Sequence, residues 1–245
     1  VHCISDWGHD FRPDYRRLRT FVEALPPGTP VLGCTATAND RVIDDVRTQL
    51  GAELVLQRGP LARAGLRLQV LEMPSQAHRL AWLAETLPQL SGTGIVYCLT
   101  VADTRIVADF LNGRGLDVVA YSGDDETGWK TSAEERLLTN DVKALIATSA
   151  LGMGFDKPDV GFVVHYQAPG SPIAYYQQVG RAGRALERSD AILLRGSEDQ
   201  RIQDYFLDAA FPDPARVDAV LNVLHGAGEP VSIGSLEVAA NPSRG

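Results

Sequence analysis

Cysteine is scarce in this chain, which has three cysteines and two methionines among its 245 residues. Cys3, Cys34 and Cys98 are far apart and form no Cys-x-x-Cys pair. That spacing excludes a zinc site and a redox-active dithiol, so no metal-binding residues are predicted. The three cysteines are interpreted as reduced residues of the protein core, a common role for an unpaired cysteine.

Long hydrophobic runs are also missing. None of the apolar stretches reaches the ~18 residues that a membrane-spanning helix needs, so no membrane contact is expected. The N-terminus shows no signal or transit peptide pattern, since Val1 and His2 lead directly into a polar and aromatic segment. These two absences predict a cytoplasmic protein.

The chain lacks a positive net charge, because 31 acidic residues against 23 lysines and arginines leave a formal charge of −8. A protein that coats nucleic acid through non-specific charge would be strongly basic, so that class is excluded. A groove that holds a strand through backbone amides, hydroxyls and a few arginines remains compatible with this charge. The arginines are grouped, with one group near the start and another at Arg181, Arg184 and Arg188.

One further absence concerns nucleotides. The sequence contains no G-x-x-x-x-G-K-[ST] motif, so the glycine loop and lysine that surround the phosphates of ATP are not among these residues. The chain by itself is therefore not expected to hydrolyse ATP.

Short apolar strands alternate with amphipathic helices along most of the chain, and this alternation predicts an α/β fold. The sheet is expected to be parallel and to carry helices on both faces, with ligands at the carboxyl ends of its strands. A capping box at Ser132 to Glu135 marks the start of one helix. Predicted strands span 30–34, 54–57, 66–73, 94–99, 118–122, 144–149, 161–165 and 191–194. Predicted helices span 14–24, 40–50, 76–90, 101–112, 132–140, 171–181, 197–209 and 217–224, before a weakly patterned tail.

The segment from Gly180 to Arg184 reads Gly-Arg-Ala-Gly-Arg. Arg181 and Arg184 are three residues apart at a helix end and therefore lie on one face. The glycines allow that face to approach a phosphate closely, and guanidinium groups match phosphate oxygens with a permanent charge. The pattern favours phosphate binding, and the alternative is a surface cluster of ion pairs with Glu187 and Asp190.

A second pattern, Gly-Met-Gly-Phe-Asp, follows a predicted strand and contains Gly154 and Asp156. Such a glycine turn brings backbone N–H groups towards a ligand. Thr148 and Ser149, just before it, carry hydroxyl groups suited to a nucleic-acid phosphate. Asp156 is expected to accept from a ribose hydroxyl or to pair with Arg184, while the alternative is a cap in an ordinary loop.

The first fifteen residues hold many aromatic and polar side chains, in the sequence VHCISDWGHDFRPDY. Trp7 and Phe11 offer faces on which bases can stack, worth ~1–3 kcal/mol per base. His9 and Arg12 are able to reach a phosphate or a nucleotide. Burial of Trp7 and Phe11 in the core is the alternative, since aromatic side chains are commonly found there.

Two of these stretches resemble the motor of RecQ-type helicases, which belong to superfamily 2. YYQQVGRAGR is similar to their motif VI, and ATSALGMGFDKPDV is similar to their motif V. The resemblance implies that Arg184 is the arginine finger, that Arg181 is a second phosphate contact and that Gln177 links nucleotide to DNA. Gln178 and Ala185 depart from the family, which usually has Glu and Asp at these positions.

The opening segment resembles the aromatic-rich loop that couples single-stranded DNA to ATP hydrolysis in that family. Val1 and His2 match the last two positions of an Asp-Glu-x-His box, whose acidic pair would hold Mg²⁺. Thr35-Ala-Thr37 is similar to motif III, and the segment with Thr100 is similar to motif IV, although Leu-Thr-Val replaces the usual Asn-Ser-Arg. The resemblance implies that the residues coupling to ATP are His2, Thr35, Thr37, Gly154 and Asp156. It implies that the DNA contacts are Trp7, His9, Phe11, Arg12, Thr100, Thr148 and Ser149.

The implied fold is a RecA-like parallel sheet in each of two lobes, of which the first is incomplete. The implied divisions are the end of the first RecA-like domain, a linker, the complete second domain and the start of a following segment, at 1–58, 59–65, 66–210 and 211–245. The implied protein is an ATP-dependent DNA helicase that moves 3′ to 5′ in DNA repair or recombination. It would use ATP and Mg²⁺, both bound with residues upstream of Val1, and its partner would be single-stranded or duplex DNA.

Other interpretations remain open. A DEAD-box RNA helicase of the same superfamily would have His-Arg in place of Gln177-Gln178 and would lack the WGHDFRP loop. A second alternative is a non-catalytic truncated protein that only binds single-stranded DNA or a partner. A third is the product of a pseudogene, whose exposed half-interface makes it aggregate. No oligomeric state is predicted.

Overall fold

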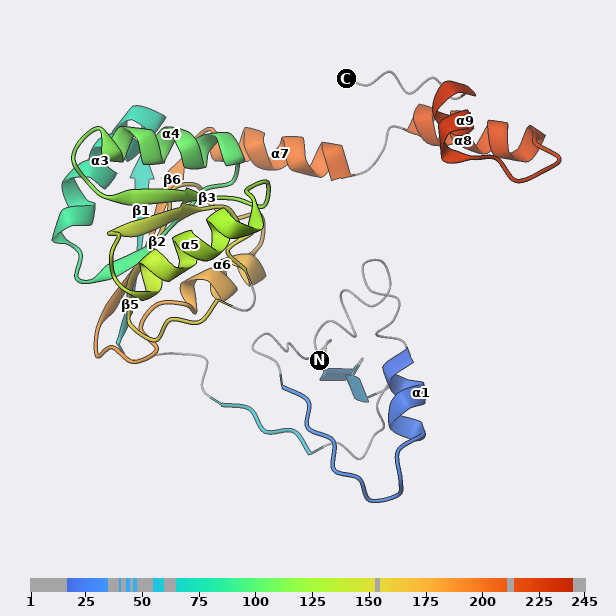
Figure 1. Cartoon of the computed structure of the whole chain (residues 1–245), viewed down its shortest axis with the longest axis horizontal. Helices are drawn as coiled ribbons and strands as arrows, with labels where there is room; N and C mark the ends of the chain where they lie inside the picture. Colours follow the sequence, from blue (N-terminus) through green and yellow to red (C-terminus); the bar gives the residue numbers. More distant parts are fainter. Residues whose placement is uncertain are drawn as a thin grey trace.

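The computed structural model describes residues 17–34, 40, 43–44, 46–47, 55–59, 65–152, 155–210 and 214–239. Most of them belong to one α/β domain that begins near Gly65 (Figure 1). No helix within these ranges is both long enough and apolar enough to cross a membrane. The predicted division at 1–58, 59–65, 66–210 and 211–245 stays a prediction.

Six strands form the sheet of this domain, in the order β1-β6-β5-β2-β4-β3, and every adjacent pair is parallel. The strands are β1 (Leu66–Met73), β2 (Thr93–Tyr97), β3 (Val118–Tyr121), β4 (Ala144–Ala147), β5 (Val160–His165) and β6 (Ser189–Gly196). The predicted parallel sheet is confirmed. Each of the six strands predicted after residue 65 is present, with its ends shifted by at most two residues.

Helices cover both faces of the sheet, as the sequence pattern predicts (Figure 1). Leu83 of α3 and Leu111 of α4 pack on one face, whereas Leu137 of α5 and Ala182, just after α6, pack on the other. The helices are α1 (Arg17–Glu23), α3 (Gln76–Thr86) with the short helix η3 (Leu87–Gln89), α4 (Val101–Asn112), α5 (Thr127–Leu138), α6 (Pro172–Val179), α7 (Asp199–Ala210), α8 (Pro214–Gly226) and α9 (Ile233–Ala239).

Hydrogen-bonding side chains mark where three of these helices begin. Ser75 before α3, Thr100 before α4 and Ser171 before α6 each accept from the backbone N–H three residues further on. This satisfies a donor that the first turn of a helix leaves without an internal partner. Pro172 occupies the start of α6, where its fixed φ angle suits a helix.

Two strands predicted before residue 65 are wrong. Residues 30–34 and 55–57 have irregular backbone, and Leu32 and Val55 are 89% and 88% exposed. Apolar side chains alone do not make a strand, because the backbone groups of a strand also need a neighbouring strand to bond with. Neither segment pairs with a strand among the residues that the structure describes.

Two further helix predictions are corrected. The capping box predicted at Ser132–Glu135 lies inside α5, which already begins at Thr127. A tertiary contact supports the earlier start, since Trp129 Nε1 in the first turn donates to Ala120 O of β3 at 3.3 Å. The tail with little sequence pattern contains α9, which packs against α8 and is capped by Ser232. The error at the capping box reflects a local signal that was weaker than a contact with β3.

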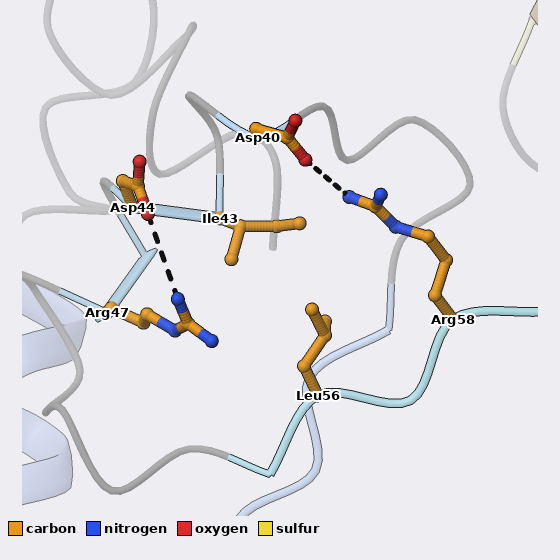
Figure 2. A pocket seen from close by; sticks show the side chains of 6 residues that line it. All are labelled: Asp40, Ile43, Asp44, Arg47, Leu56 and Arg58. Carbon is orange, nitrogen blue, oxygen red and sulfur yellow. Dashed lines mark hydrogen bonds and ion pairs between the residues drawn. The ribbon is translucent and has the colours of Figure 1, made fainter.

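A shallow polar pocket lies among the described residues that precede the domain (Figure 2). Arg58 donates to Asp40 at 3.0 Å, and Arg47 lies 3.8 Å from Asp44. The side chains of both pairs are largely exposed, and exposed pairs typically contribute under about 1 kcal/mol. These pairs therefore do little to stabilise this part of the chain.

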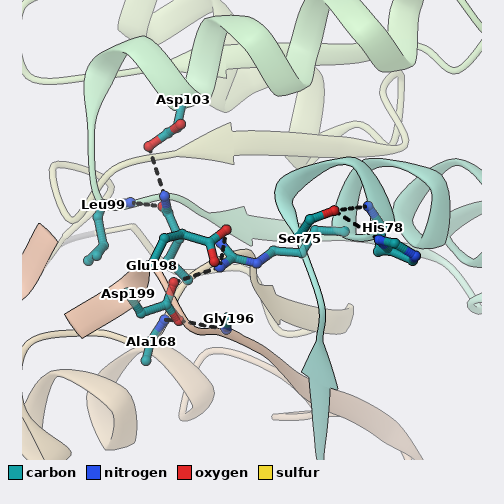
Figure 3. Close-up of polar contacts among 10 residues, drawn as sticks. Ser75, His78, Leu99, Asp103, Ala168, Gly196, Glu198 and Asp199 are labelled. Carbon is teal, nitrogen blue, oxygen red and sulfur yellow. Dashed lines mark hydrogen bonds and ion pairs between the residues drawn. The ribbon is translucent and has the colours of Figure 1, made fainter. Parts of the chain in front are cut away.

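One buried charge organises the carboxyl end of the sheet. Arg79 of α3 is fully buried and donates to Asp199 at 2.7 Å and to Glu198 at 2.8 Å. Asp199 also accepts from the backbone N–H groups of Ala168 and Gly196 (Figure 3). A charge taken out of water is costly unless it is paired and hydrogen-bonded, as it is here. The cluster thereby joins α3, the end of β6, the start of α7 and the loop after β5.

Replacing Arg79 with methionine should leave the Asp199 carboxylate buried without its partner. We expect Arg79→Met to lower the free energy of unfolding by about 3–5 kcal/mol, measured by urea denaturation at neutral pH. Arg136→Met is the matched control, because it removes an exposed ion pair with Asp117 and should cost under about 1 kcal/mol. Equal losses in the two variants would contradict the role assigned to Arg79.

Candidate nucleotide and nucleic-acid sites

Two groups of predicted site residues lie at opposite edges of the sheet. Thr100 and Thr148 follow β2 and β4 at the carboxyl edge, where ligands were expected. The loop with Arg184 lies at the amino edge instead, since Gly183 N donates to Val160 O at 3.0 Å, where β5 begins. The arginines follow a helix beside the strands and do not lie at the carboxyl ends where ligands were expected. The reason is that α6 runs back along β5, so the residues that follow α6 lie beside the start of that strand.

Arg184 forms an ion pair with Asp156, which lies in the loop before β5. The arginine side chain is 39% exposed and the aspartate side chain is 69% exposed, so a ligand has access to both. Of the two partners predicted for Asp156, the pairing with Arg184 is confirmed, and the contact with a ribose hydroxyl stays a prediction. An accessible guanidinium oriented by one carboxylate is suited to meeting a phosphate.

Arg181 has a different environment from Arg184, although the two residues belong to one motif. Its Nη1 donates to Phe155 O at 2.9 Å, and its guanidinium lies beside the hydroxyl of Tyr97. Its Nε is buried and has no hydrogen-bond partner among the described residues. Burial raises the pKa of Tyr97 to about 12, and the nearby guanidinium offsets part of this rise. Arg181 therefore holds the loop with Phe155 in place, and its predicted phosphate contact stays a prediction.

Gln178, which departs from the family pattern, is paired with a buried histidine. His165 is fully buried at the end of β5, and its Nε2 lies 2.9 Å from Gln178 Oε1. Its ring centroid lies 5.6 Å from that of Tyr97 and 5.0 Å from that of Tyr175. Burial lowers the pKa of His165 to about 4, so the ring is neutral at pH 7. A neutral amide suits this neutral partner, whereas a glutamate would bring a charge into a buried site.

Thr148 and Ser149 follow β4 at the carboxyl edge. The backbone N–H of Thr148 donates to Tyr121 O at 3.1 Å, and the Thr148 hydroxyl accepts from Ala150 N at 3.3 Å. Thr148 is buried, whereas Ser149 is exposed. Of the two predicted DNA contacts, Ser149 is therefore the one whose side chain is accessible to a strand.

Thr100 is already engaged by its neighbours. Its hydroxyl accepts from Asp103 N at 3.0 Å and donates to the Asp103 carboxylate at 2.7 Å. Gln167 donates to the same carboxylate at 2.9 Å and accepts from Leu99 N at 2.9 Å (Figure 3). The hydrogen bond from the Thr100 hydroxyl to Asp103 must break before this hydroxyl can donate to a phosphate. The motifs did not indicate Asp103 or Gln167, although an acidic residue three positions after a capping threonine is a recognisable capping pattern.

One stretch of chain connects the two edges, and we call its described residues, 148–152 and 155–156, the crossing segment. It starts at Thr148 on the carboxyl edge and ends at Asp156, which pairs with Arg184 on the amino edge. Leu151 in its middle is buried against the face covered by α5, and the Tyr97 hydroxyl donates to the carbonyl of Leu151 at 3.2 Å. The described residues of the crossing segment thus include predicted DNA contacts at one end and a predicted nucleotide contact, Asp156, at the other.

The roles of the remaining predicted residues stay predictions. Gln177 is half-buried on α6. No group of three or more metal-binding side chains occurs in the part of the chain that the structure describes. The predicted site residues that lie outside the described ranges are His2, Trp7, His9, Phe11, Arg12, Thr35, Thr37 and Gly154.

Comparison with known proteins gives relatives of two kinds. A model of the helicase conserved C-terminal domain matches residues 78–186. The chain is 37% identical over 204 residues to the RecQ-like DNA helicase blm-1 of Caenorhabditis elegans. The aligned region covers 81% of this chain and 20% of that protein. It is 36% identical over 205 residues to ATP-dependent DNA helicase Q1 of Mus musculus. That aligned region covers 81% of this chain and 31% of that protein.

Solved structures give a likeness of fold. The structure of S. cerevisiae Dbp5 bound to RNA and ADP BeF3 is similar with a TM-score of 0.67 and 22% identity, covering 84% of this chain and 55% of that chain. The sheet and the matched family together define the class, which is a RecA-like domain of a superfamily-2 helicase. Within that class, the chain belongs to the RecQ-type helicases. It spans less than a third of the length of the two curated relatives described above.

The buried neutral ring of His165 should make folding stability depend on pH. Its pKa is about 4 in the folded domain and returns to an ordinary value near 6.5 on unfolding. Between these values only the unfolded chain binds the proton, so stability falls as the pH falls, by about 3 kcal/mol in total. His165→Gln removes the titrating ring and should flatten the profile of unfolding free energy between pH 6.5 and pH 4. An unchanged slope in this variant would show that other groups are responsible.

The two arginines of the motif should differ in their effect on folding. Arg181→Met removes the contact with Phe155 O, and we expect it to lower the free energy of unfolding by about 1–3 kcal/mol. Arg184→Met removes an exposed pair and should change it by under about 0.5 kcal/mol. Urea denaturation measures both, and hydrogen exchange in the crossing segment should rise only in the Arg181 variant. A larger loss for Arg184→Met would reverse this assignment.

Proposed function

We propose that this chain supplies the second RecA-like domain of an ATP-dependent DNA helicase that moves 3′ to 5′ along single-stranded DNA. The observation that carries the proposal is the crossing segment, which leads from Ser149 on one edge of the sheet to Asp156 and Arg184 on the other. A motor needs such a connection, because a change at its nucleotide must displace its grip on the strand. Action in DNA repair or recombination, in the cytoplasm, belongs to the same proposal.

Arg184 acts in this proposal as the arginine finger. Its guanidinium is exposed, and Asp156 orients it without burying it. When a nucleotide is held between the two lobes, the guanidinium meets the terminal phosphate and stabilises the charge that develops during hydrolysis. Arg181 acts by positioning the loop that carries Asp156, since it bonds the neighbouring Phe155 carbonyl.

The DNA strand lies along the carboxyl edge in this proposal. Ser149 and the backbone beside it contact a phosphate. Thr100 adds a further contact once the hydrogen bond from its hydroxyl to Asp103 breaks. Contacts to phosphates hold a strand without reading its sequence, which suits a motor that must pass over any sequence. Trp7, His9, Phe11 and Arg12 supply the stacking faces and further contacts proposed for the first lobe. His2, Thr35, Thr37, Gly154 and Gln177 couple these contacts to the nucleotide.

Mg²⁺ and the phosphates of ATP need ligands that the described residues do not supply. The sequence has no phosphate-binding glycine loop, and the described residues contain no cluster of metal-binding side chains. ATP and Mg²⁺ enter the proposal as cofactors of the whole motor, to which this chain contributes the arginine.

Sequence identity favours DNA over RNA as the substrate of this motor. The two named relatives at 36–37% identity are DNA helicases, whereas the likeness to Dbp5 at 22% identity shows the fold alone. Gln177-Gln178 also stands where a DEAD-box RNA helicase would have His-Arg. A non-catalytic DNA-binding protein is the other candidate, because these residues lack the phosphate-binding loop.

A chimera tests the proposal directly. The chain replaces its aligned segment in the mouse Q1 helicase, and DNA-stimulated ATP hydrolysis and unwinding of tailed duplexes are measured. We expect an active chimera that needs a 3′ tail. Arg184→Lys in the chimera should lower ATP hydrolysis roughly a thousandfold with unchanged affinity for single-stranded DNA, because lysine cannot reproduce the guanidinium fork. Arg136→Lys is the matched control and should have no effect, since it lies in an exposed pair on α5.

Three results would contradict the proposal. Full ATP hydrolysis by the Arg184→Lys chimera would show that Arg184 is not the arginine finger. A chimera that binds DNA but neither hydrolyses ATP nor unwinds would support the non-catalytic alternative. DNA-stimulated ATP hydrolysis by the 245-residue chain alone would mean that the nucleotide site does not need a complete first lobe.

A further inference from the structure

A pocket lies between α7 and the start of α4, and α7 carries none of the motifs described above. Its cavity of about 410 Å³ is lined by Thr100, Glu198, Arg201, Ile202, Tyr205 and Phe206. Residues three or four positions apart share one side of a helix, so the lining residues of α7 form one continuous stripe. A cavity of this size lies within the range of small-ligand sites.

Two aromatic rings dominate one wall of this pocket. Tyr205 is 68% exposed and Phe206 is 47% exposed, and their ring centroids lie 5.9 Å apart in an edge-to-face arrangement. Exposed rings beside a cavity offer a flat apolar surface that water solvates poorly. A planar, partly apolar group would bury that surface.

The pocket offers one exposed cation to an anionic ligand. The carboxylate of Glu198 is held 2.8 Å from the buried Arg79, which also pairs with Asp199. Arg201 is exposed and forms no ion pair with a residue that the structure describes. One exposed guanidinium therefore stands one helical turn from the ring of Tyr205, a combination of permanent charge and π surface that suits a nucleotide.

We propose that this pocket binds one unpaired nucleotide of a single-stranded DNA, with its base on Tyr205 and Phe206 and its phosphate on Arg201. The inference rests on the proposed function, because Thr100 is both a wall of the pocket and a proposed DNA contact at the carboxyl edge. A strand that passes Ser149 and Thr100 would continue onto α7. Stacking on aromatic rings tolerates any base, so the pocket would extend the grip of the motor without adding sequence preference.

The test measures binding of a fluorescein-labelled oligo(dT) to the purified chain by anisotropy at several salt concentrations. The double variant Tyr205→Ala with Phe206→Ala should weaken binding about tenfold without changing the salt dependence, because it removes only stacking. Arg201→Gln should weaken binding and reduce the salt slope by about one, as expected for the loss of one phosphate contact. Arg136→Gln removes an equal charge elsewhere and should leave binding unchanged. Tyr205→Phe keeps the ring and should retain affinity.

A second readout reports stacking itself. A single 2-aminopurine in the oligonucleotide should lose fluorescence on binding to the wild-type chain and keep it with the double variant. If the wild-type chain binds DNA and the double variant and Arg201→Gln bind equally well, the pocket is not a DNA site, while the proposed function stands. If the double variant lowers the melting temperature and leaves DNA affinity unchanged, other residues of this chain fill the pocket and the inference is wrong. If the wild-type chain binds no DNA at low salt, both the inference and the proposed function fail.

Discussion

All six strands of this domain are parallel. Every connection must therefore run back from the carboxyl end of one strand to the amino end of the next. The crossing segment and α6 are two such connections, and they lie on the same face. One carries the chain from Thr148 at the carboxyl edge to Asp156 at the amino edge, and the other returns it to Arg184. The pairing of Asp156 with Arg184 is therefore a consequence of parallel topology, which brings the ends of two successive crossings to one place.

The polar groups buried in the domain show how this arrangement is held. Arg79 is paired with two carboxylates and fixes the start of α7 against the end of β6. His165 is kept neutral by burial, and its partner Gln178 is neutral as well. A buried charge without a partner would cost several kcal/mol, so each group is either paired or uncharged. Gln178 departs from the family pattern, but it matches its own surroundings.

Family and fold answer different questions about this chain. The fold is shared with DEAD-box proteins that bind RNA, because a RecA-like sheet supports many motors. The RecQ-type assignment comes from sequence identity over most of the chain. The geometry adds a distinction that neither comparison makes, since two arginines of one motif have different surroundings. Arg184 is accessible and paired with the carboxylate of Asp156. Arg181 instead donates to the carbonyl of Phe155 and lies beside the hydroxyl of Tyr97.

The sequence by itself determined the alternation of strands and helices after residue 65, the parallel sheet and the residues of the two glycine-containing motifs. These features depend on local patterns, such as apolar runs, capping threonines and glycine turns, which act over a few residues. Only the tertiary structure decided that residues 30–34 and 55–57 are not strands, because strands need partners to bond with. It alone placed Arg184 at the amino edge, joined Asp103 to Gln167 and gathered the pocket between α4 and α7. Such contacts join residues far apart in the chain, and no local pattern encodes which of them will meet.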